Sequence, residues 1–401
     1  MRFTKGLFFR IEATIPKNRI ASMFLEKKPL LWFIGGVVLR FDTEAGKPRK
    51  NDFQMTVKVK DVSLLFTLLP FKGNYFKHYH APTLKIIIMA LANTSTTTGL
   101  LIAAPIVNNA GKLLGKSMSD IWVSISSVSS ALEFIIPPIA STISIIILIG
   151  FAVSFLSTVF KCVPFDLYIK GDLITSVSGL ISKRYTSFKR EAINNLIIIK
   201  SPIMRILRHS TVKVNVAGYG KHKGEIAVFI PAANKRELAG LIEDFLPSMV
   251  SKPIMLRPPY RSLRRYLTQP FVLFFIISLV SIFLSNRFTN FKDFIEFMTI
   301  ISFIVLAVFG ELSLKKYVQS GIAFGEHVAV LSSRKFSLVE LRCKFEKIGV
   351  IKISQTPFDR KHNLCKMKLT IRSESADSIT VANLDYSELK VALLNNYNIA
   401  I

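Results

Sequence analysis

The sequence predicts an α+β membrane protein in which three small β-rich modules alternate with two pairs of membrane-spanning helices. Three observations predict this architecture: a β-rich stretch recurs three times, four long apolar segments lie between the copies, and basic residues flank those segments. The chain of 401 residues is half apolar, with a mean hydropathy of +0.40, and its net charge is +27. Apolar and basic character together are typical of a membrane protein with large basic parts on one side.

The repeated stretch is clearest at residues 179–218. Within it, residues 196–199 and 212–216 read as strands, and the second run has the period-two alternation of a half-buried strand. Between the two runs, Pro202 cannot donate a hydrogen bond to a ladder, so we expect the pairing to break there.

Two other segments align with this stretch without gaps. An offset of 173 residues carries residues 6–41 onto it, and an offset of 155 carries it onto residues 334–369. Three copies that share the spacing from Ile193 to Pro202 are much less expected by chance than one. The pattern therefore predicts one small β-rich module used three times.

Each module is expected to end in a strand and a helix. In the middle module residues 226–230 read as the strand and 234–246 as an amphipathic helix. The third module ends in the same way at 379–381 and 386–394, and the first at 57–70. The predicted modules are 1–81, 161–250 and 313–401.

The modules differ at their starts. The middle one has residues 165–178 before its Gly179, enough for two strands about a turn at Lys170-Gly171-Asp172. The first has only five residues before Gly6. We therefore expect the first module to lack the counterpart of this two-stranded segment at 165–178, and the natural gene to extend upstream.

Four apolar segments are long enough to span a bilayer, which takes roughly 20 residues of helix. The first hairpin occupies 84–160 and the second 266–312; the four spans are about 84–107, 134–160, 266–284 and 294–312. Lys and Arg are concentrated on the module side of the spans, which predicts that the modules and both termini are cytoplasmic. Three cysteines without metal-ligand spacing indicate a reducing compartment.

Three motifs resemble the bacterial pleckstrin-homology-like membrane proteins of the YdbT type. They are ITSVSGLISKR at 174–184, the strand at 193–199 with Ser201-Pro202, and ISQTPFDRKHNL at 353–364. The resemblance covers nearly the whole chain. It implies that each module is a PH-like seven-stranded β-sandwich or barrel closed by a C-terminal helix. Family members commonly begin with another transmembrane pair, and the family's molecular role is poorly defined.

No catalytic, cofactor-binding or metal-binding constellation is predicted. His78 and His80 could be two metal ligands, but no third ligand is near them in sequence, and a solvated pair beside the membrane is favoured. Asn93, Thr94 and Thr97 place polar groups inside the first predicted span. They could line a polar path, although hydrogen bonds between helices are the favoured role.

Two basic clusters are candidate contacts for anionic lipid, to which each charge near the surface contributes on the order of 1 kcal/mol. One consists of Lys183, Arg184, Lys189 and Arg190, and the other of Arg257, Arg261, Arg264 and Arg265. For the first cluster a solvated strand face is favoured over a specific site for a lipid headgroup. For the second, the alternative is that the arginines only satisfy the positive-inside rule.

The favoured function is a non-enzymatic protein of the bacterial inner membrane without cofactors. Its cytoplasmic modules would contact anionic lipid, a membrane-protein partner or a second copy, as a scaffold of the cell envelope. The alternative is a transporter or channel-like protein that uses the polar first span. Nucleic acid is excluded as a partner because four spans are predicted and no aromatic and basic stacking pattern is present.

Overall fold

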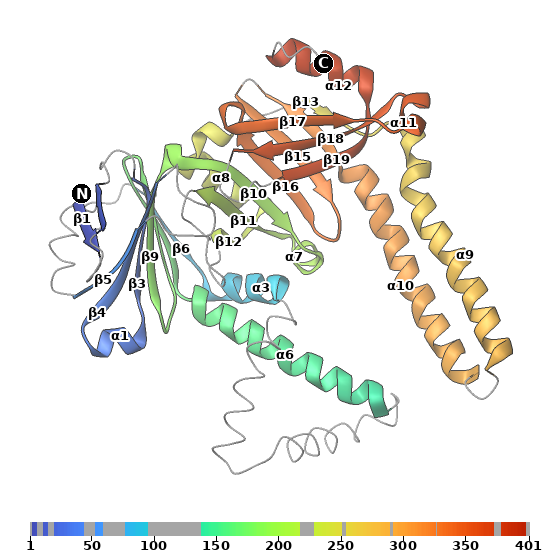
Figure 1. Cartoon of the computed structure of the whole chain (residues 1–401), viewed down its shortest axis with the longest axis horizontal. Coiled ribbons are helices and arrows are strands. Elements are labelled where there is room, and N and C mark those ends of the chain that lie inside the picture. Colours follow the sequence, from blue (N-terminus) through green and yellow to red (C-terminus); the bar gives the residue numbers. More distant parts are fainter. Residues whose placement is uncertain are drawn as a thin grey trace.

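The fold is α+β, with β-sheets at one end and long helices leading away from them (Figure 1). The protein is described from a computed structural model. The described residues are 2–5, 11–14, 20–43, 53–58, 77–94, 138–216, 228–250, 254–288, 292–325, 327–372 and 378–397. In this part of the chain the strands form two seven-stranded sheets, one three-stranded sheet and one hairpin.

The first seven-stranded sheet has the order β5-β4-β3-β9-β8-β7-β6. Its strands are β3 (Ile20–Lys27), β4 (Gly36–Thr43), β5 (Phe53–Lys58), β6 (Lys77–Ala81), β7 (Phe165–Lys170), β8 (Leu173–Ser178) and β9 (Lys183–Lys189). All neighbouring strands are antiparallel. The sheet thus joins strands that lie before the first predicted helical pair with strands that lie after it.

The second seven-stranded sheet has the order β12-β11-β10-β16-β15-β14-β13. Its strands are β10 (Ile193–Lys200), β11 (His209–Val216), β12 (Val228–Asn234), β13 (Ile254–Leu256), β14 (Gly321–Phe324), β15 (Val328–Arg334) and β16 (Leu338–Lys344). The three-stranded sheet contains β17 (Ile348–Ser354), β18 (Leu364–Ile371) and β19 (Ser378–Asp385). The separate hairpin pairs β1 (Arg2–Lys5) with β2 (Ile11–Thr14).

Several local predictions are confirmed. The runs at 196–199 and 212–216 lie in β10 and β11, and β7 and β8 meet at a turn where Gly171 has a φ of +58°. The closing helices are α8 (Lys235–Phe245) and α12 (Tyr386–Tyr397). Only residues 57 and 58 of the predicted closing segment of the first module, 57–70, are described, and they end β5. Residues 59–76 lie outside the described residues.

The sequence offsets of 173 and 155 also relate the hydrogen-bond registers of three hairpins. We call β1–β2, β8–β9 and β15–β16 the opening hairpins. The equivalent pairs are Phe3 with Ala13, Ser176 with Thr186, and Leu331 with Leu341. Residues 2–5 are therefore the counterpart of the end of β8, so the strand immediately before Gly6 is present in the described structure.

A second set of strands follows each opening hairpin with the same local features. We call β3–β5, β10–β12 and β17–β19 the first, second and third closing sets. The leading strand of each has a β-bulge, located between Ile20 and Ser22, Ile193 and Asn195, and Ile348 and Val350. A one-turn helix that begins with proline follows in each: α1 (Pro29–Phe33), α7 (Pro202–Ile206) and α11 (Pro357–Lys361).

The proline at these positions therefore starts a helix between two paired strands. Its missing N–H is not needed at the first helical position, so the helix tolerates it there. Ser201 caps α7, since its hydroxyl accepts a hydrogen bond of 3.3 Å from the N–H of Met204. After the helix the chain turns through a left-handed residue, and the three equivalents are Gly35 (φ +71°), Arg208 (φ +56°) and Asn363 (φ +48°).

Replacing Arg208 by glycine should stabilise the protein. An L-residue in the left-handed region costs about 1–2 kcal/mol, whereas glycine adopts it freely and loses about 0.5–1 kcal/mol more backbone entropy. Arg208 is exposed, so few contacts are lost. We expect the free energy of unfolding to rise by about 0.5 kcal/mol in thermal melts of the full chain. Arg205→Gly, at an exposed position of helix α7 nearby, should instead lower the free energy of unfolding. Equal effects of the two changes would contradict this interpretation.

Two junctions join an opening hairpin to the preceding closing set. At the first junction β3 pairs with β9, and at the second β10 pairs with β16. The same offsets carry one register onto the other: Leu25 lies opposite Tyr185, and Ile198 lies opposite Glu340. Hydrogen bonds therefore connect consecutive strand sets edge to edge.

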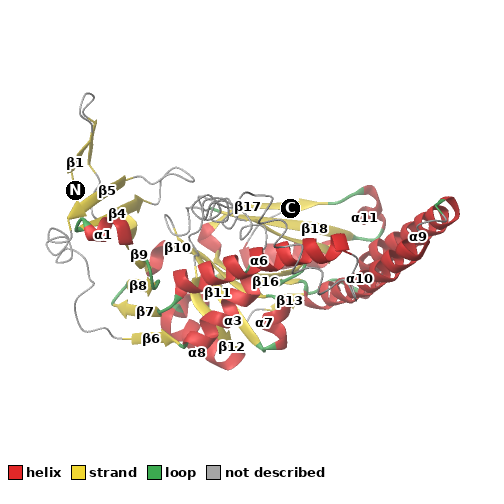
Figure 2. Cartoon of the chain, turned by 90° about the horizontal axis from the view of Figure 1, so that it is seen from below, coloured by secondary structure: helices red, strands yellow, loops and turns green. Residues whose placement is uncertain are grey.

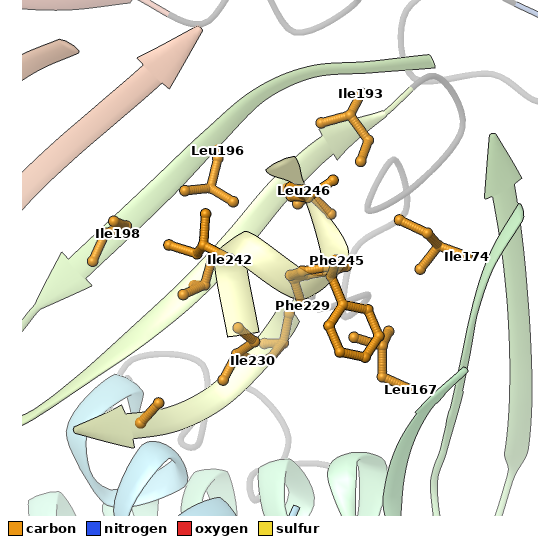
Figure 3. Packing of buried hydrophobic residues seen from close by; sticks show 14 of the residues in the cluster. Leu167, Ile174, Ile193, Leu196, Ile198, Phe229, Ile230, Ile242, Phe245 and Leu246 are labelled. Atoms are coloured by element: carbon orange, nitrogen blue, oxygen red, sulfur yellow. The ribbon is translucent and has the colours of Figure 1, made fainter. Parts of the chain in front are cut away.

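The hydrophobic cores follow a different division from the sheets. The largest core combines Leu167 and Ile174 of the first seven-stranded sheet with Leu196 and Phe229 of the second, and α8 adds Phe245 (Figure 3). A further core combines β14–β16 with the third closing set and α12. The opening hairpins β8–β9 and β15–β16 therefore each pack in one core with the closing set that follows them in the chain. Each of them shares a β-sheet, however, with the closing set that precedes it in the chain.

The long helices are inserted after the first strand of a strand group. β6 pairs with β7 and β13 with β14, although α3 (Thr83–Asn93) and α6 (Pro138–Cys162) follow β6, and α9 (Leu263–Arg287) and α10 (Lys292–Gln319) follow β13. The sequence placed residues 77–81 at the end of the first module, but their backbone pairs with the strand after the helices. The reason is that backbone pairing depends on spatial proximity and leaves no signature in these side chains.

Helices α9 and α10 pack against each other and extend beyond the sheets in both views (Figures 1 and 2). Among the described residues, one helix is long and apolar enough to cross a membrane, Tyr260–Arg287, which contains an 18-residue stretch with a mean hydropathy of 2.3. The described parts of the other three predicted spans are helical, in α3, α6 and α10. Their passage through a membrane stays a prediction, and residues 95–137 lie outside the described residues.

Candidate functional site

The first junction contains a buried charge cluster. Glu26 on β3 is 5% exposed, and its carboxylate accepts hydrogen bonds from Arg40 Nη2 on β4 and Arg184 Nε on β9, both at 3.2 Å. The guanidinium of Arg40 also lies 4.0 Å from the centre of the Phe24 ring. Because Arg184 comes from the other side of the junction, the cluster ties the two strand sets together. Nothing in the sequence pattern distinguishes Glu26, since an isolated glutamate carries no pairing signal.

The second junction has a different chemistry at the equivalent positions. The counterparts of Glu26 and Arg184 are Ile199 and Val339, which lie opposite each other on β10 and β16. The counterpart of Arg40 is Lys213, whose pKa is lowered by burial. One junction is therefore held by paired charges and the other by apolar side chains, on the same backbone register.

The first predicted basic cluster is divided by the structure. Lys183 and Arg184 lie at the start of β9, and Lys189 and Arg190 lie at its end. A strand rises about 3.3 Å per residue, which puts the two pairs about 20 Å apart. Lys183 is exposed, whereas Arg184 is engaged with Glu26. Lipid contact by these residues stays a prediction.

Two of the four arginines of the second predicted basic cluster form ion pairs with carboxylates. Arg261 forms an ion pair with Asp385, and Arg265 forms one with Asp359. Nη2 of Arg265 also donates a 2.8 Å hydrogen bond to the carbonyl oxygen of Phe358. These contacts fasten the start of α9 to α11 and to the end of β19, and we call them the α9 anchor.

The other two arginines of that cluster, Arg257 and Arg264, are exposed. In the described ranges, neither takes part in an ion pair. Both lie within one to two turns of the α9 anchor in the sequence, at the end of the candidate span nearest the sheets. They are therefore the members of the predicted cluster that are accessible for an external anion, and that role stays a prediction.

The carboxylates of the α9 anchor have lowered pKa values. Burial alone would raise the pKa of Asp359, but hydrogen bonds from Thr356 and the charge of Arg265 hold it below its usual value. Burial would also raise the pKa of Asp385. Hydrogen bonds from Ser387 and from the N–H of Glu388, together with the charge of Arg261, nevertheless hold this pKa below its usual value. Asp385 is also the N-cap of α12, since its Oδ1 accepts hydrogen bonds from the N–H groups of Ser387 and Glu388.

The α9 anchor should weaken in acid. A carboxylate with a lowered pKa in the folded state contributes stability above its unfolded pKa of about 3.9, and that stability is lost as the pH falls through the lower folded pKa. We expect the melting temperature of wild type to exceed that of the double variant Asp359→Asn, Asp385→Asn at pH 7, and the difference to shrink as the pH falls below about 4. Asparagine keeps the capping geometry, so the comparison isolates the charge. A constant difference between pH 7 and pH 3 would contradict this account.

A comparable fastening holds α3 to α8. Nζ of Lys85 lies 2.5 and 2.6 Å from the two carboxylate oxygens of Glu237, and Lys77 on β6 forms an ion pair with Asp244. Between them, burial and the charge of Glu237 raise the pKa of Tyr79. The first helix of each inserted helical segment, α3 or α9, is thus attached by ion pairs to the strand group that follows that segment in the chain.

The two histidines beside the first predicted span share a third residue that is distant in sequence. Nε2 of His78 and Nδ1 of His80 lie 3.1 and 2.8 Å from the same oxygen of Asp166, and the His78 ring stacks on Tyr168. Both rings are about half exposed. Over the described stretches of the chain, no three His, Cys, Asp or Glu side chains are arranged to hold a metal ion.

The polar residues of the first predicted span bond within their own helix where they are described. Asn93 Nδ2 donates a 3.0 Å hydrogen bond to the carbonyl oxygen of Met89, and Thr94 donates to that of Ala90. Thr97 lies outside the described residues. The predicted contacts between helices stay a prediction.

The three cysteines are free thiols and buried. Burial raises the pKa of Cys162 to about 11 and that of Cys343 to about 12. Burial, assisted by the charges of Asp385 and Asp359, raises the pKa of Cys365 to about 12. Native thiols of this kind are poorly reactive at neutral pH.

Comparison with known proteins identifies what the strand groups resemble. A family model described as a bacterial PH domain matches residues 123–245 and 272–396, which contain β7–β12 with α8 and β14–β19 with α12. The chain is 23% identical over 251 residues to the UPF0699 transmembrane protein YdbT of Bacillus subtilis (strain 168). That match covers 60% of this chain and 48% of the relative, so the chain spans about half the length of the curated relative it matches. The resemblance read from the sequence motifs is thereby confirmed.

Proposed function

The chain belongs to the bacterial PH domain family, and from this premise we propose that it is a non-enzymatic integral membrane scaffold. It would hold three PH-like modules as one body at a membrane surface, for contacts with proteins or anionic lipid. The transmembrane name of the Bacillus relative and the apolar exposed helix Tyr260–Arg287 support the membrane part of the proposal.

The observation that carries the scaffold role is the pair of junctions. Separate modules on flexible linkers would move independently, whereas β3–β9 and β10–β16 pairing makes each sheet continuous across a boundary. The buried contact between Glu26 and Arg184 adds an ion pair across the first junction, beside the one that Glu26 forms with Arg40 in its own strand set. A body of this kind presents its surfaces in a fixed mutual geometry, which is what a scaffold requires.

The three-module interpretation rests on the shared registers and bulges of the opening hairpins and closing sets. Two helical hairpins would attach this body to the bilayer, since α6 and the α9–α10 pair lead away from the sheets on the same side (Figure 1). The ion pairs at α3 and α9 would fix the angle at which the helices leave the body. In the alternative transport role Asn93 and Thr94 would face a path, but both bond within their own helix, which favours the scaffold.

Arg257 and Arg264 would contact anionic headgroups next to the span. The test titrates the full chain in detergent with phosphatidylglycerol or phosphatidylcholine and counts bound lipids by native mass spectrometry. Phosphatidylglycerol should be preferred, and the double variant Arg257→Gln, Arg264→Gln should weaken its binding roughly tenfold or more, because each charge contributes about 1 kcal/mol.

Arg287→Gln provides the matched control. It removes one positive charge at the far end of α9, about 36 Å away by helix rise, and should leave lipid selectivity unchanged. Equal binding of the two lipids by wild type, or an equal loss in the control, would refute the headgroup contact. The scaffold itself would be refuted by limited proteolysis that separates the strand sets of the intact protein into independently moving parts.

The proposed location is the bacterial inner membrane, with all modules in the cytoplasm. Lys and Arg concentrate on the sheet side of the predicted spans, as the positive-inside rule requires. Reporter fusions after residues 220 and 401 should both be active only with a cytoplasmic reporter. Export of either fusion would refute this orientation.

A further inference from the structure

The open edge of β17 is built like two edges that are occupied elsewhere in the same chain. β17 leads the third closing set, as β3 and β10 lead the first and second, with the same bulge and the same following one-turn helix. β3 and β10 each pair on their outer edge with the second strand of an opening hairpin. Among the strands that the structure describes, β17 pairs with β18 alone.

The burial of β17 agrees with a missing neighbour. Leu25 on β3 and Ile198 on β10 are 1% and 2% exposed, and their equivalent on β17 is Ile353. Ile353 is half-buried, although it also faces the hydrophobic core of its own strand group. The β-bulge does not block pairing, since β3 and β10 carry it and are paired. The edge is therefore competent to accept one more antiparallel strand.

A strand of the matching type is present in the same chain. β2 is the equivalent of β9 and β16, the two strands that occupy β3 and β10. Within the described residues β2 pairs only with β1. β1–β2 and β17 lie far apart in both views, so β2 cannot reach β17 of its own chain in this structure (Figures 1 and 2).

We propose that β17 of one copy pairs with β2 of a second copy of this chain, which continues the junctions from molecule to molecule. The two known junctions define the register of the proposed pair. When the residue pairs of either junction are shifted by the sequence offsets onto β17 and β2, the same residues lie opposite each other. Ile351 would lie opposite Thr14, Lys352 opposite Ala13, and Ile353 opposite Glu12. Such a contact is head-to-tail, and it generates a ring if the rotation closes or a filament in the membrane plane if it does not.

The test is disulfide cross-linking between two variants of the full chain, purified separately and mixed in detergent. Lys352→Cys is combined with Ala13→Cys, positions that are directly opposite in the proposed register and thus within the usual Cα separation for a disulfide. The three native thiols are buried, so they contribute little background. The control combines Lys352→Cys with Glu12→Cys, because a one-residue shift moves a side chain to the other face of the sheet.

We expect at least tenfold more cross-linked dimer from the pair Lys352→Cys with Ala13→Cys than from the control pair Lys352→Cys with Glu12→Cys. Size-exclusion chromatography with light scattering verifies that each variant is folded and reports assemblies larger than one chain for wild type. Equal cross-linking of both pairs, absence of cross-linking with folded variants, or a strictly monomeric wild type would overturn it. Selective cross-linking of Lys352→Cys to a different protein in membranes would also overturn the choice of a second copy. None of these outcomes bears on lipid selectivity, so the scaffold proposal is tested separately.

Discussion

Replacing Glu26 by alanine should lower the free energy of unfolding by about 3 kcal/mol. The change removes the buried carboxylate to which Arg40 and Arg184 both donate and leaves their positive charges at the junction, which is the costly way to break a buried ion pair. Glu346, exposed on the short turn before β17, provides the control, and Glu346→Ala should change stability by less than about 0.5 kcal/mol. Chemical unfolding of the full chain in detergent measures both.

The second junction suggests a rescue of this loss. The triple variant Glu26→Ile, Arg40→Lys, Arg184→Val copies the residues that stand at the equivalent positions, Ile199, Lys213 and Val339. Replacing a buried ion pair such as Glu26–Arg184 by well-packed apolar groups is often neutral or stabilising, and burial lowers the pKa of the lysine at the third equivalent position, Lys213. This variant should therefore recover most of the loss. A Glu26→Ala variant as stable as Glu346→Ala would show that the cluster does not hold the junction.

Replacing Phe229 by alanine should cost about 3–5 kcal/mol, the usual range for a large aromatic side chain in a core. Phe229 is 1% exposed, and its ring meets that of Phe245 edge to face, with centroids 6.0 Å apart. Phe358, 77% exposed on α11, is the matched control, and Phe358→Ala should have little effect.

The Phe229 variant should also reveal how the strand groups are coupled. The core around Phe229 lies between the two seven-stranded sheets, so its loss should loosen β9 and β10 and with them both junctions. Hydrogen exchange in the destabilised protein should therefore accelerate together in β3 and β16, the strands that pair with β9 and β10 across the two junctions. Acceleration confined to β10–β12 and α8 would show that the junctions do not transmit the loss.

The sequence by itself determined the local elements of this protein. A continuous apolar run located β10, period-two alternation located β11, an apolar face every third or fourth residue located α8, and Gly171 marked the turn between β7 and β8. The β-bulges and the left-handed residues also occur at positions related by the ungapped sequence offsets. These features depend on short-range backbone sterics, which recur where the local sequence recurs.

The tertiary structure alone decided which strands became neighbours. β6 pairs with β7 across an inserted helical segment, and β3 pairs with β9, because a backbone hydrogen bond joins any two edges that the fold brings together and requires no particular side chains. The same is true of the sites. The sequence pattern predicted a surface charge at Arg184, but this side chain binds Glu26. Arg261 and Arg265, which lie in one sequence cluster, are paired with carboxylates from elsewhere in the chain. An ion pair is a property of two positions in space, and the spacing of residues along one segment cannot encode the second position.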